Sequence, residues 1–167
     1  MTEHKGRLLA LILTAAVAAP SVGATPFLAS TQVDPGLALL DEIGMRADAD
    51  NDGRITDVEI NVFAQKAFPL LDADGNGSLD DEEMRGTPAM SGLAAFRDRE
   101  QAYSASMGVV FDLFDRDGSG SVDAEEYRIG LTRGAVRADR DGDGALSRNE
   151  FRNAFFVSRA LRRGLIE

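Results

Sequence analysis

Apolar residues recur at helical spacing along most of this chain, and four short segments rich in Asp and Gly interrupt them. Apolar positions at helical spacing usually face inward, so the pattern predicts helices whose apolar faces pack together. Pro35 directly after Asp34 predicts the start of a first helix, and further helices are predicted over residues 94–114 and 148–163. The large apolar residues expected in the core are Phe63, Phe68, Leu71, Phe111, Phe114, Tyr127, Phe151, Phe155 and Phe156.

The four polar segments share one pattern over twelve residues. Each has Asp at its first and third positions, Asp, Asn or Ser at the fifth, Gly at the sixth and Glu at the twelfth; they are residues 48–59, 72–83, 115–126 and 139–150. The third segment follows the first by 67 residues, and the fourth follows the second by the same 67, which indicates a duplicated two-segment unit. A solvated surface turn is the usual alternative for Asp and Gly together, but four complete copies of the pattern argue against it. Oxygens at this spacing can surround one calcium ion, which takes six to eight of them.

The segments resemble the calcium-binding loops of the EF-hand family at each diagnostic position. The resemblance implies an all-α fold, an EF-hand helix–loop–helix array, that binds up to four calcium ions. It also implies a backbone carbonyl ligand at position seven, an often water-bridged ligand at nine, and a Glu at twelve that contributes two oxygens and favours calcium over magnesium. The implied ligand positions are Asp48, Asp50, Asp52, Arg54, Thr56 and Glu59; Asp72, Asp74, Asn76, Ser78, Asp80 and Glu83; Asp115, Asp117, Ser119, Ser121, Asp123 and Glu126; and Asp139, Asp141, Asp143, Ala145, Ser147 and Glu150.

The eighth position of each loop is apolar, and in the family this residue forms a short β-bridge to a partner loop. These residues are Ile55, Leu79, Val122 and Leu146. Which loops pair stays open, because only residues 60–71 separate the first two loops and only residues 127–138 separate the last two. A single shared helix of twelve residues, about 18 Å long, would hold its two loops at opposite ends. Alternatively, Pro69, and Gly130 with Gly134, break each segment into two short helices, so that neighbouring loops pair.

The duplication predicts two EF-hand units, residues 34–86 and 94–167. Gly and Pro within residues 85–92 indicate a helix end and a linker, which we place at residues 87–93.

The N-terminal segment predicts export. Lys5 and Arg7 precede an apolar run at residues 8–19 that is too short for a stable membrane span, and small residues follow it. We therefore expect residues 1–24 to be a Sec-type signal peptide and residues 25–33 to be a flexible mature N-terminus. The expected location is the bacterial periplasm or the secreted fraction, and a retained membrane anchor is the alternative. Because the chain has no Cys, a lipid anchor on Cys and a disulfide framework are both excluded.

The charge of the chain narrows the range of partners. With 18 basic and 28 acidic residues its net charge is −10, and loss of Glu3, Lys5 and Arg7 with the signal peptide would make it −11. Such a surface disfavours nucleic acid, and it disfavours membranes after signal cleavage. His4 is the single His and lies within the signal peptide, so triads based on His, Cys nucleophiles and most zinc sites are excluded and no enzymatic activity is expected.

We therefore expect a calcium-binding protein outside the cytoplasm, a calcium-responsive sensor or interaction protein with an unidentified protein partner. A passive calcium buffer or a calcium-stabilised structural protein is the alternative. Arg159, Arg162 and Arg163 fall in the last turn of the final predicted helix, where cations suit the helix dipole. A docking patch for an acidic partner is the other interpretation of these three arginines.

Overall fold

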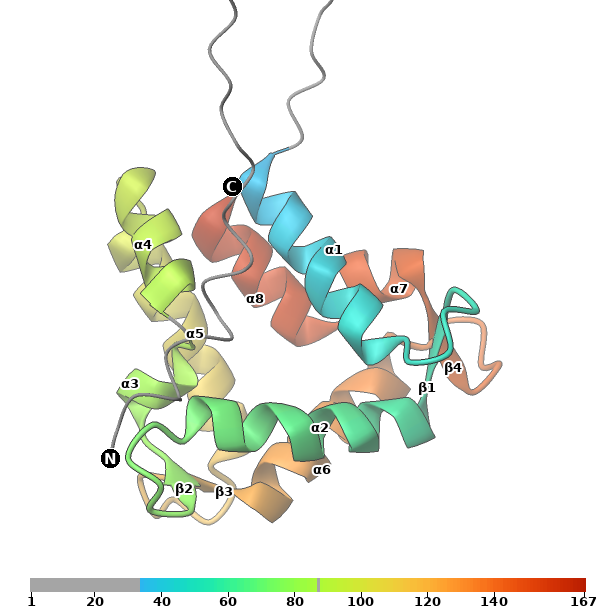
Figure 1. The fold of residues 1–167 in the computed structure, drawn as a ribbon, viewed down its shortest axis with the longest axis horizontal. Coiled ribbons are helices and arrows are strands. Elements are labelled where there is room, and N and C mark those ends of the chain that lie inside the picture. The colour runs from blue at the N-terminus through green and yellow to red at the C-terminus, as the bar shows by residue number, and fades with distance from the viewer. Residues whose placement is uncertain (1–33, 87) are drawn as a thin grey trace, which may run out of the picture. The chain divides into compact units, whose positions relative to one another are not determined.

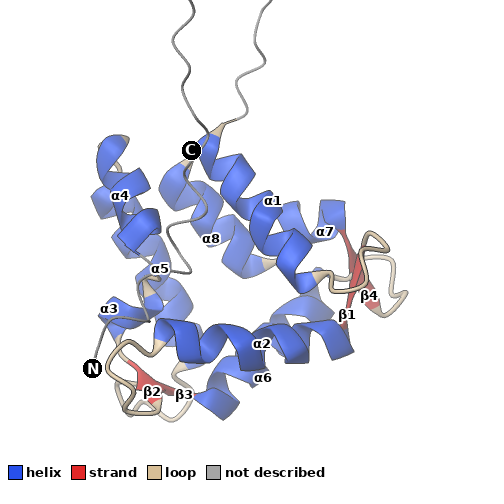
Figure 2. Ribbon diagram, in the orientation of Figure 1, coloured by secondary structure: helices blue, strands red, loops and turns tan. Residues whose placement is uncertain are grey.

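The computed structural model describes residues 34–86 and 88–167, and the predicted signal peptide (1–24) and N-terminal segment (25–33) lie outside them. The elements, labelled in Figure 1, are α1 (Pro35–Ala47), β1 (Arg54–Thr56), α2 (Asp57–Leu71), β2 (Ser78–Leu79), α3 (Asp81–Met84), α4 (Pro88–Phe96), α5 (Glu100–Phe114), β3 (Val122–Asp123), α6 (Ala124–Ala138), β4 (Ala145–Ser147), α7 (Arg148–Asn153) and α8 (Phe156–Leu165). Helices dominate and the strands are two or three residues long (Figure 2), which confirms the all-α prediction. No helix among the described residues combines the length and the apolar character that crossing a membrane requires.

The first helix begins where the sequence predicts it. The Asp34 carboxylate accepts hydrogen bonds from the backbone N–H groups of Gly36, at 2.8 Å, and Leu37, at 3.3 Å. These bonds satisfy donors that a helix start leaves free, and Pro35 has no N–H to satisfy. Arg97 pairs with the second Asp34 oxygen at 2.7 Å, which ties the start of α1 to the end of α4.

A single helix joins the first loop to the second, and another joins the third to the fourth, so the shared-helix alternative is the correct one. The helix α2 runs from the first loop to the second, with Pro69 inside its last turn, and α6 runs from the third loop to the fourth. Gly130 and Gly134 do not break α6. A Cβ at Gly130 would overlap the Phe114 ring, and a Cβ at Gly134 would overlap Phe156. Both glycines therefore let aromatic rings approach the helix backbone.

Because neighbouring loops sit at opposite ends of one helix, they pair with loops of the other sequence unit. Strands β1 and β4 are antiparallel, with Ile55 opposite Leu146, and β2 and β3 are antiparallel, with Leu79 opposite Val122. The predicted β-bridges are confirmed, and all four of these side chains are buried. The first loop thus pairs with the fourth, and the second pairs with the third.

The two shared helices lie side by side and run in opposite directions between the two loop pairs, as Figure 1 shows. Fifteen residues give each helix a length of about 22 Å. The Arg128 guanidinium on α6 donates to the Asn61 side chain on α2 at 3.1 Å. Helix α8 packs between α1 and α5. Residues 34–86 and 94–167 therefore contact each other through both loop pairs. Their division into two units stays a prediction from the sequence.

Two predicted helices are each interrupted. The helix predicted over 94–114 is two helices, α4 and α5, because Asp98 adopts a left-handed backbone conformation with φ of 53°. Most of the predicted linker, residues 88–93, belongs to α4. The helix predicted over 148–163 is interrupted between α7 and α8, where the N–H groups of Ala154 and Phe155 both donate to the Glu150 carbonyl.

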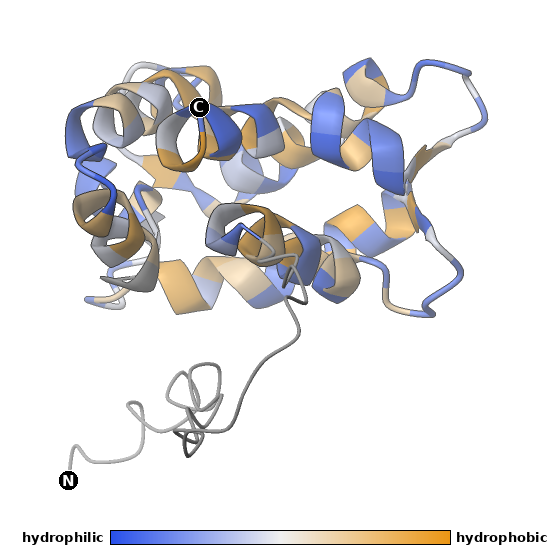
Figure 3. Cartoon of the chain, turned by 90° about the horizontal axis from the view of Figure 1, so that it is seen from above, coloured by the Kyte–Doolittle hydropathy of each residue, from blue (hydrophilic) through white to orange (hydrophobic). Residues whose placement is uncertain are grey.

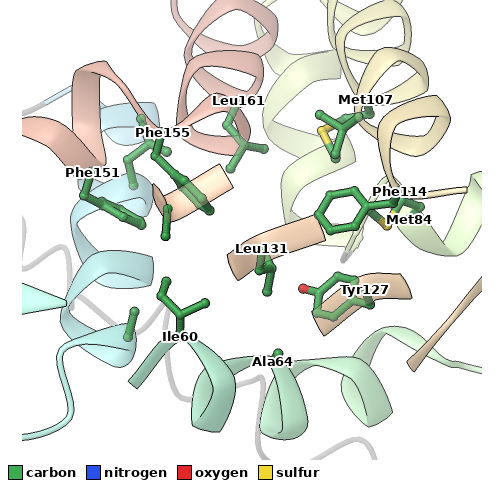
Figure 4. Close-up of a cluster of buried hydrophobic side chains, with 14 of the residues drawn as sticks. Ile60, Ala64, Met84, Met107, Phe114, Tyr127, Leu131, Phe151, Phe155 and Leu161 are labelled. Atoms are coloured by element: carbon green, nitrogen blue, oxygen red, sulfur yellow. The ribbon is translucent and has the colours of Figure 1, made fainter. Parts of the chain in front are cut away.

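The core is a continuous set of apolar side chains that reaches from one loop pair to the other (Figure 4). Aromatic rings contact one another in sequence along it, with centroid separations of 5.4–5.8 Å; their order is Phe68, Tyr127, Phe114, Phe156, Phe155 and Phe151. Of the residues predicted for the core, Phe63, Leu71 and Phe156 are half-buried and the other six are buried. Figure 3 shows hydrophilic residues in the loops at both ends of this core.

Candidate metal sites

The fold brings together the first, third and twelfth residues of every loop. In each loop one oxygen from each of these carboxylates lies within 4.8 Å of the others, a separation that one cation can bridge. The four clusters are Asp48, Asp50 and Glu59; Asp72, Asp74 and Glu83; Asp115, Asp117 and Glu126; and Asp139, Asp141 and Glu150.

The first Asp of each loop accepts hydrogen bonds from backbone N–H groups further along the same loop. In the first loop the Asp48 carboxylate accepts the N–H groups of Asp52, at 3.1 Å, and Gly53, at 3.0 Å. The equivalent bonds to the sixth-position glycine are 2.9–3.0 Å in the other loops. That glycine has φ between 84° and 88° in all four loops, a conformation that side chains with a Cβ rarely adopt. The predicted role of Gly in the sharp turn is therefore present in each loop.

The twelfth residue is fixed by both the loop and the helix that follows. In the first loop one Glu59 oxygen accepts the Ala49 N–H at 2.8 Å, and the other accepts the Thr56 N–H at 2.8 Å. Glu59 is the third residue of α2, and Thr56, as the N-cap, accepts the Glu59 N–H in return. This reciprocal capping box recurs at Asp80, Asp123 and Ser147.

The ninth residue therefore has a role that the ligand assignment did not include. It begins the exiting helix, and in three further loops its oxygen accepts the N–H of the twelfth-position Glu at 2.7–3.3 Å. The spacing of Ser, Thr or Asp three residues before Glu is the sequence signal for this box. The predicted contribution of these residues to a cation, directly or through water, stays a prediction.

The fifth and seventh residues line the same turn. The side-chain oxygen at position five accepts the N–H of position seven at 2.8–3.3 Å; the position-five residues are Asp52, Asn76, Ser119 and Asp143. Arg54, Ser78 and Ala145 at position seven each start a strand, and Ser121 directly precedes β3. Their predicted carbonyl ligation also stays a prediction.

Hydrogen bonds favour the charged form of two closing glutamates, Glu59 and Glu150. The N–H groups of Arg140 and Ser147, with the Ser147 hydroxyl, lower the pKa of Glu150 to about 2. The Thr56 N–H lowers the pKa of Glu59 in the same way. The Asp143 N–H lowers the pKa of Asp141, but desolvation and the charges of Asp143 and Glu150 outweigh it and leave that pKa raised. Glu59 and Glu150 are therefore ionised and available to a cation at neutral pH.

One side chain links two candidate sites. The Arg54 guanidinium in the first loop pairs with the Asp143 carboxylate in the fourth loop at 2.5 Å. This contact raises the pKa of Arg54 and lowers that of Asp143. Sequence reasoning assigned only the backbone carbonyl of Arg54. The signal it passed over is that the seventh residue is Arg here and Ser, Ser and Ala in the other loops.

The donor set determines which cation fits. Every side-chain donor assigned here is an oxygen, and most are carboxylates, which matches a hard cation such as calcium. Helix–loop–helix segments that pair through short strands and surround clustered carboxylates define a class of cation-binding proteins.

Comparison with known families agrees with this class. A family model described as EF hand matches residues 63–86, 109–131 and 137–156, which contain the second, third and fourth loops. The first loop lies outside the matched residues but has the same carboxylate cluster and the same capping box. No protein of curated function matches the chain. The matched segments and the four carboxylate clusters support an EF-hand calcium-binding family, and EF hands imply calcium binding.

Proposed function

We propose that this protein is a calcium-responsive binding protein with four sites that influence one another. The observation that carries the proposal is that α2 and α6 each connect two candidate sites, one at either end. Glu59 closes the first loop from the start of α2, and Asp72 opens the second loop as the C-cap of the same helix. Glu126 and Asp139 have the same positions on α6.

A shared helix couples its sites mechanically. An ion bound in the first loop would contact Glu59, which lies in the first turn of α2. If the ion shifts Glu59, α2 moves as a rigid body and changes the position of Asp72 at its other end. The β1–β4 and β2–β3 pairs complete the connection, because each joins a loop of one helix to a loop of the other. We infer that ions bind cooperatively and that occupancy changes the arrangement of the helices.

A passive buffer or a calcium-stabilised structural protein is the second candidate. The observation in its favour is that hydrogen bonds already hold each loop in a closed conformation, so an ion requires little rearrangement there. The two candidates differ in what happens away from the altered loop, and that difference can be measured.

The test uses calcium titration calorimetry of the full chain and of Glu126→Gln. The unaltered protein should bind four calcium ions, with magnesium much weaker. The variant should lose the third site and also bind calcium more weakly at the fourth loop, which shares α6, and at the second loop, which shares the strand pair. Three remaining sites with unchanged affinities would contradict the coupling and support a buffer.

We also propose that the protein acts outside the cytoplasm as a binding protein and has no enzymatic activity. The apolar N-terminal run followed by small residues supports export. Fractionation of expressing cells followed by N-terminal sequencing should find the protein in the periplasm or medium, starting at Thr25. Recovery of the full-length chain in the cytoplasm would contradict this location.

A further inference from the structure

Helices α5 and α8 form the walls of a groove of about 510 Å³. Arg159, Arg162 and Arg163 line it from α8, together with Phe156, and Val109 lines it from α5. Three guanidinium groups thus gather in one groove of a chain whose net charge is −10. The calcium loops do not account for this cluster, since none of the three arginines belongs to a loop.

Two of these arginines lack the partners that an acidic protein readily supplies. Arg162 pairs with the Glu167 carboxylate at 3.0 Å and donates to Asn153 at 2.5 Å. Arg159 and Arg163 form no ion pair with any carboxylate in residues 34–86 or 88–167. Both are exposed. The Arg162–Glu167 pair shows that a carboxylate can be held at the groove.

The helix dipole accounts for only part of the arrangement. Arg162 and Arg163 lie in the last turn of α8, where positive charge is favourable, but Arg159 lies before that turn. Arg159 and Arg163 are four residues apart on the helix, so they lie on one face with their Cβ atoms about 6 Å apart. This spacing matches two carboxylates one turn apart on another helix.

The α5 wall supplies an apolar surface beside these charges. Val109 is 60% exposed and Leu113, one turn further along α5, is 52% exposed. Val109 lies in the groove with the arginines, and Leu113 extends the exposed apolar surface along α5 beyond the groove lining. Such a surface is complementary to an amphipathic helix with an acidic edge.

We propose that this groove binds an acidic amphipathic helix of a partner protein. Carboxylates one turn apart on the partner pair with Arg159 and Arg163, and its apolar side chains cover Val109 and Leu113. A nucleic acid or an anionic membrane would bring a long array of negative charge against the acidic remainder of the chain, and the resulting repulsion disfavours both. A short acidic helix avoids that repulsion.

The test measures binding of a fluorescein-labelled helical peptide with Glu and Leu at helical spacing to the full, calcium-saturated chain, by fluorescence anisotropy. A peptide with Gln in place of each Glu should bind at least about tenfold more weakly, and added salt should weaken only the Glu peptide. Arg159→Glu with Arg163→Glu should weaken binding of the Glu peptide by at least about tenfold. The control, Lys66→Glu with Arg133→Glu, makes the same change of charge at exposed positions on α2 and α6 and should change affinity less than about twofold.

Several outcomes would overturn the proposal. Equal loss in both double variants would mean that net charge rather than the groove controls binding. Anionic lipid vesicles or single-stranded DNA that bind through Arg159 and Arg163 while the peptide does not would assign the groove to a different partner. Arg159→Gln with Arg163→Gln, whose helicity is verified by circular dichroism, should also lose binding, and full retention there would contradict the assignment.

Repeating the titration with chelator examines the calcium response separately. Helix α5 leads into the third loop and α8 follows the fourth, so calcium-dependent peptide binding is expected if occupancy moves these helices. Binding that is equal in both states supports the groove and counts against the calcium-responsive function.

Discussion

Arg54 places a positive charge beside Asp143, a predicted ligand of a neighbouring site. Its pair with Asp143 neutralises part of the negative charge that attracts a cation to the fourth loop, and it stabilises the contact between the first and fourth loops. The second and third loops have no such pair, since their residues at the corresponding positions are Ser78 and Ser121. The fourth loop should therefore bind calcium more weakly than its carboxylates alone would allow.

Replacing Arg54 with Gln should tighten calcium binding at the fourth loop by about two- to fivefold, the range of an exposed ion pair. A calcium titration followed through the NMR signals of the Gly142 and Gly144 amides, which donate to Asp139 within the fourth loop, would report on that loop. Arg140→Gln removes an equal charge from the fourth loop without removing an ion pair to a ligand, so it should have the smaller effect. Equal effects of the two variants, or weaker binding in Arg54→Gln, would contradict this interpretation of the pair.

Asp41 joins the helices that flank the paired first and fourth loops. From α1 it accepts hydrogen bonds from Arg152 on α7, with the Nε contact at 2.5 Å, and it pairs with Arg148 at 3.2 Å. These partners, Arg152 above all, lower the pKa of Asp41. A carboxylate with a lowered folded-state pKa stabilises the fold above its unfolded value of about 3.9, and this stability is lost as the pH falls through the folded value.

Asp41→Asn should lower the free energy of unfolding by about 1 kcal/mol at pH 7, because it removes charged hydrogen bonds that are partly exposed to solvent. Thermal melts at fixed calcium should show the difference from the unaltered protein shrinking as the pH falls below about 4. Asp112→Asn, at an exposed site on α5, is the control and should change little. A pH-independent difference would mean that the Asn disturbs packing rather than an ion pair.

At the scale of the element, two glycines of α6 allow aromatic rings from other helices to pack closely against it. Its residues Gly130 and Gly134 allow the rings of Phe114 and Phe156 to reach the helix backbone. In the interior of an isolated helix, a glycine costs about 1 kcal/mol relative to alanine, so both positions sacrifice local helix stability for contacts elsewhere.

Gly130→Ala should therefore destabilise the protein by about 1–3 kcal/mol through overpacking, although alanine is the better helix former. Gly108 on α5 is the matched control, since a Cβ there meets nothing within 4 Å. Gly108→Ala should leave stability unchanged or raise it by about 0.5–1 kcal/mol. Denaturant melts of both variants would measure the change in the free energy of unfolding. Equal changes would contradict the packing role of Gly130.

These glycines also show what sequence reasoning could and could not provide. Loop positions depend on local spacing, so the four loops, their turns and their β-bridge residues were identified from sequence alone. Gly130 could break its helix or allow an aromatic ring to contact the helix backbone. Which of these occurs depends on Phe114 of another helix, so the local sequence cannot distinguish the two cases. The breaks at Asp98, which is left-handed, and Phe155, which is extended, likewise depend on backbone conformations that the apolar pattern does not encode.

At the scale of the whole molecule, calcium and the core should stabilise the same cooperative unit. A continuous chain of aromatic contacts links the two loop pairs, so neither pair has a core of its own. Each saturated site adds about 2.7 kcal/mol when free calcium is a hundredfold above its Kd. Four sites together would rival the about 5–15 kcal/mol of a typical domain.

We therefore expect the calcium-free chain to be partly helical and loosely packed, and to become compact when calcium is added. Thermal melts followed by circular dichroism should show one transition that moves to higher temperature between chelator and millimolar calcium. Superimposable melts would contradict the coupling of metal to folding, and two separate transitions would contradict a single cooperative unit.

The crossed pairing of the loops has a consequence for how the chain reaches this structure. Strand β1 pairs with β4, which lies about 90 residues further along the chain, so the first loop has no strand partner until the residues of β4 have been synthesised. Contacts between distant segments carry a high loop-closure entropy and form late in folding. The strands of the second and third loops lie closer in sequence than those of the first and fourth, so we expect β2 and β3 to pair first and β1 and β4 to pair later.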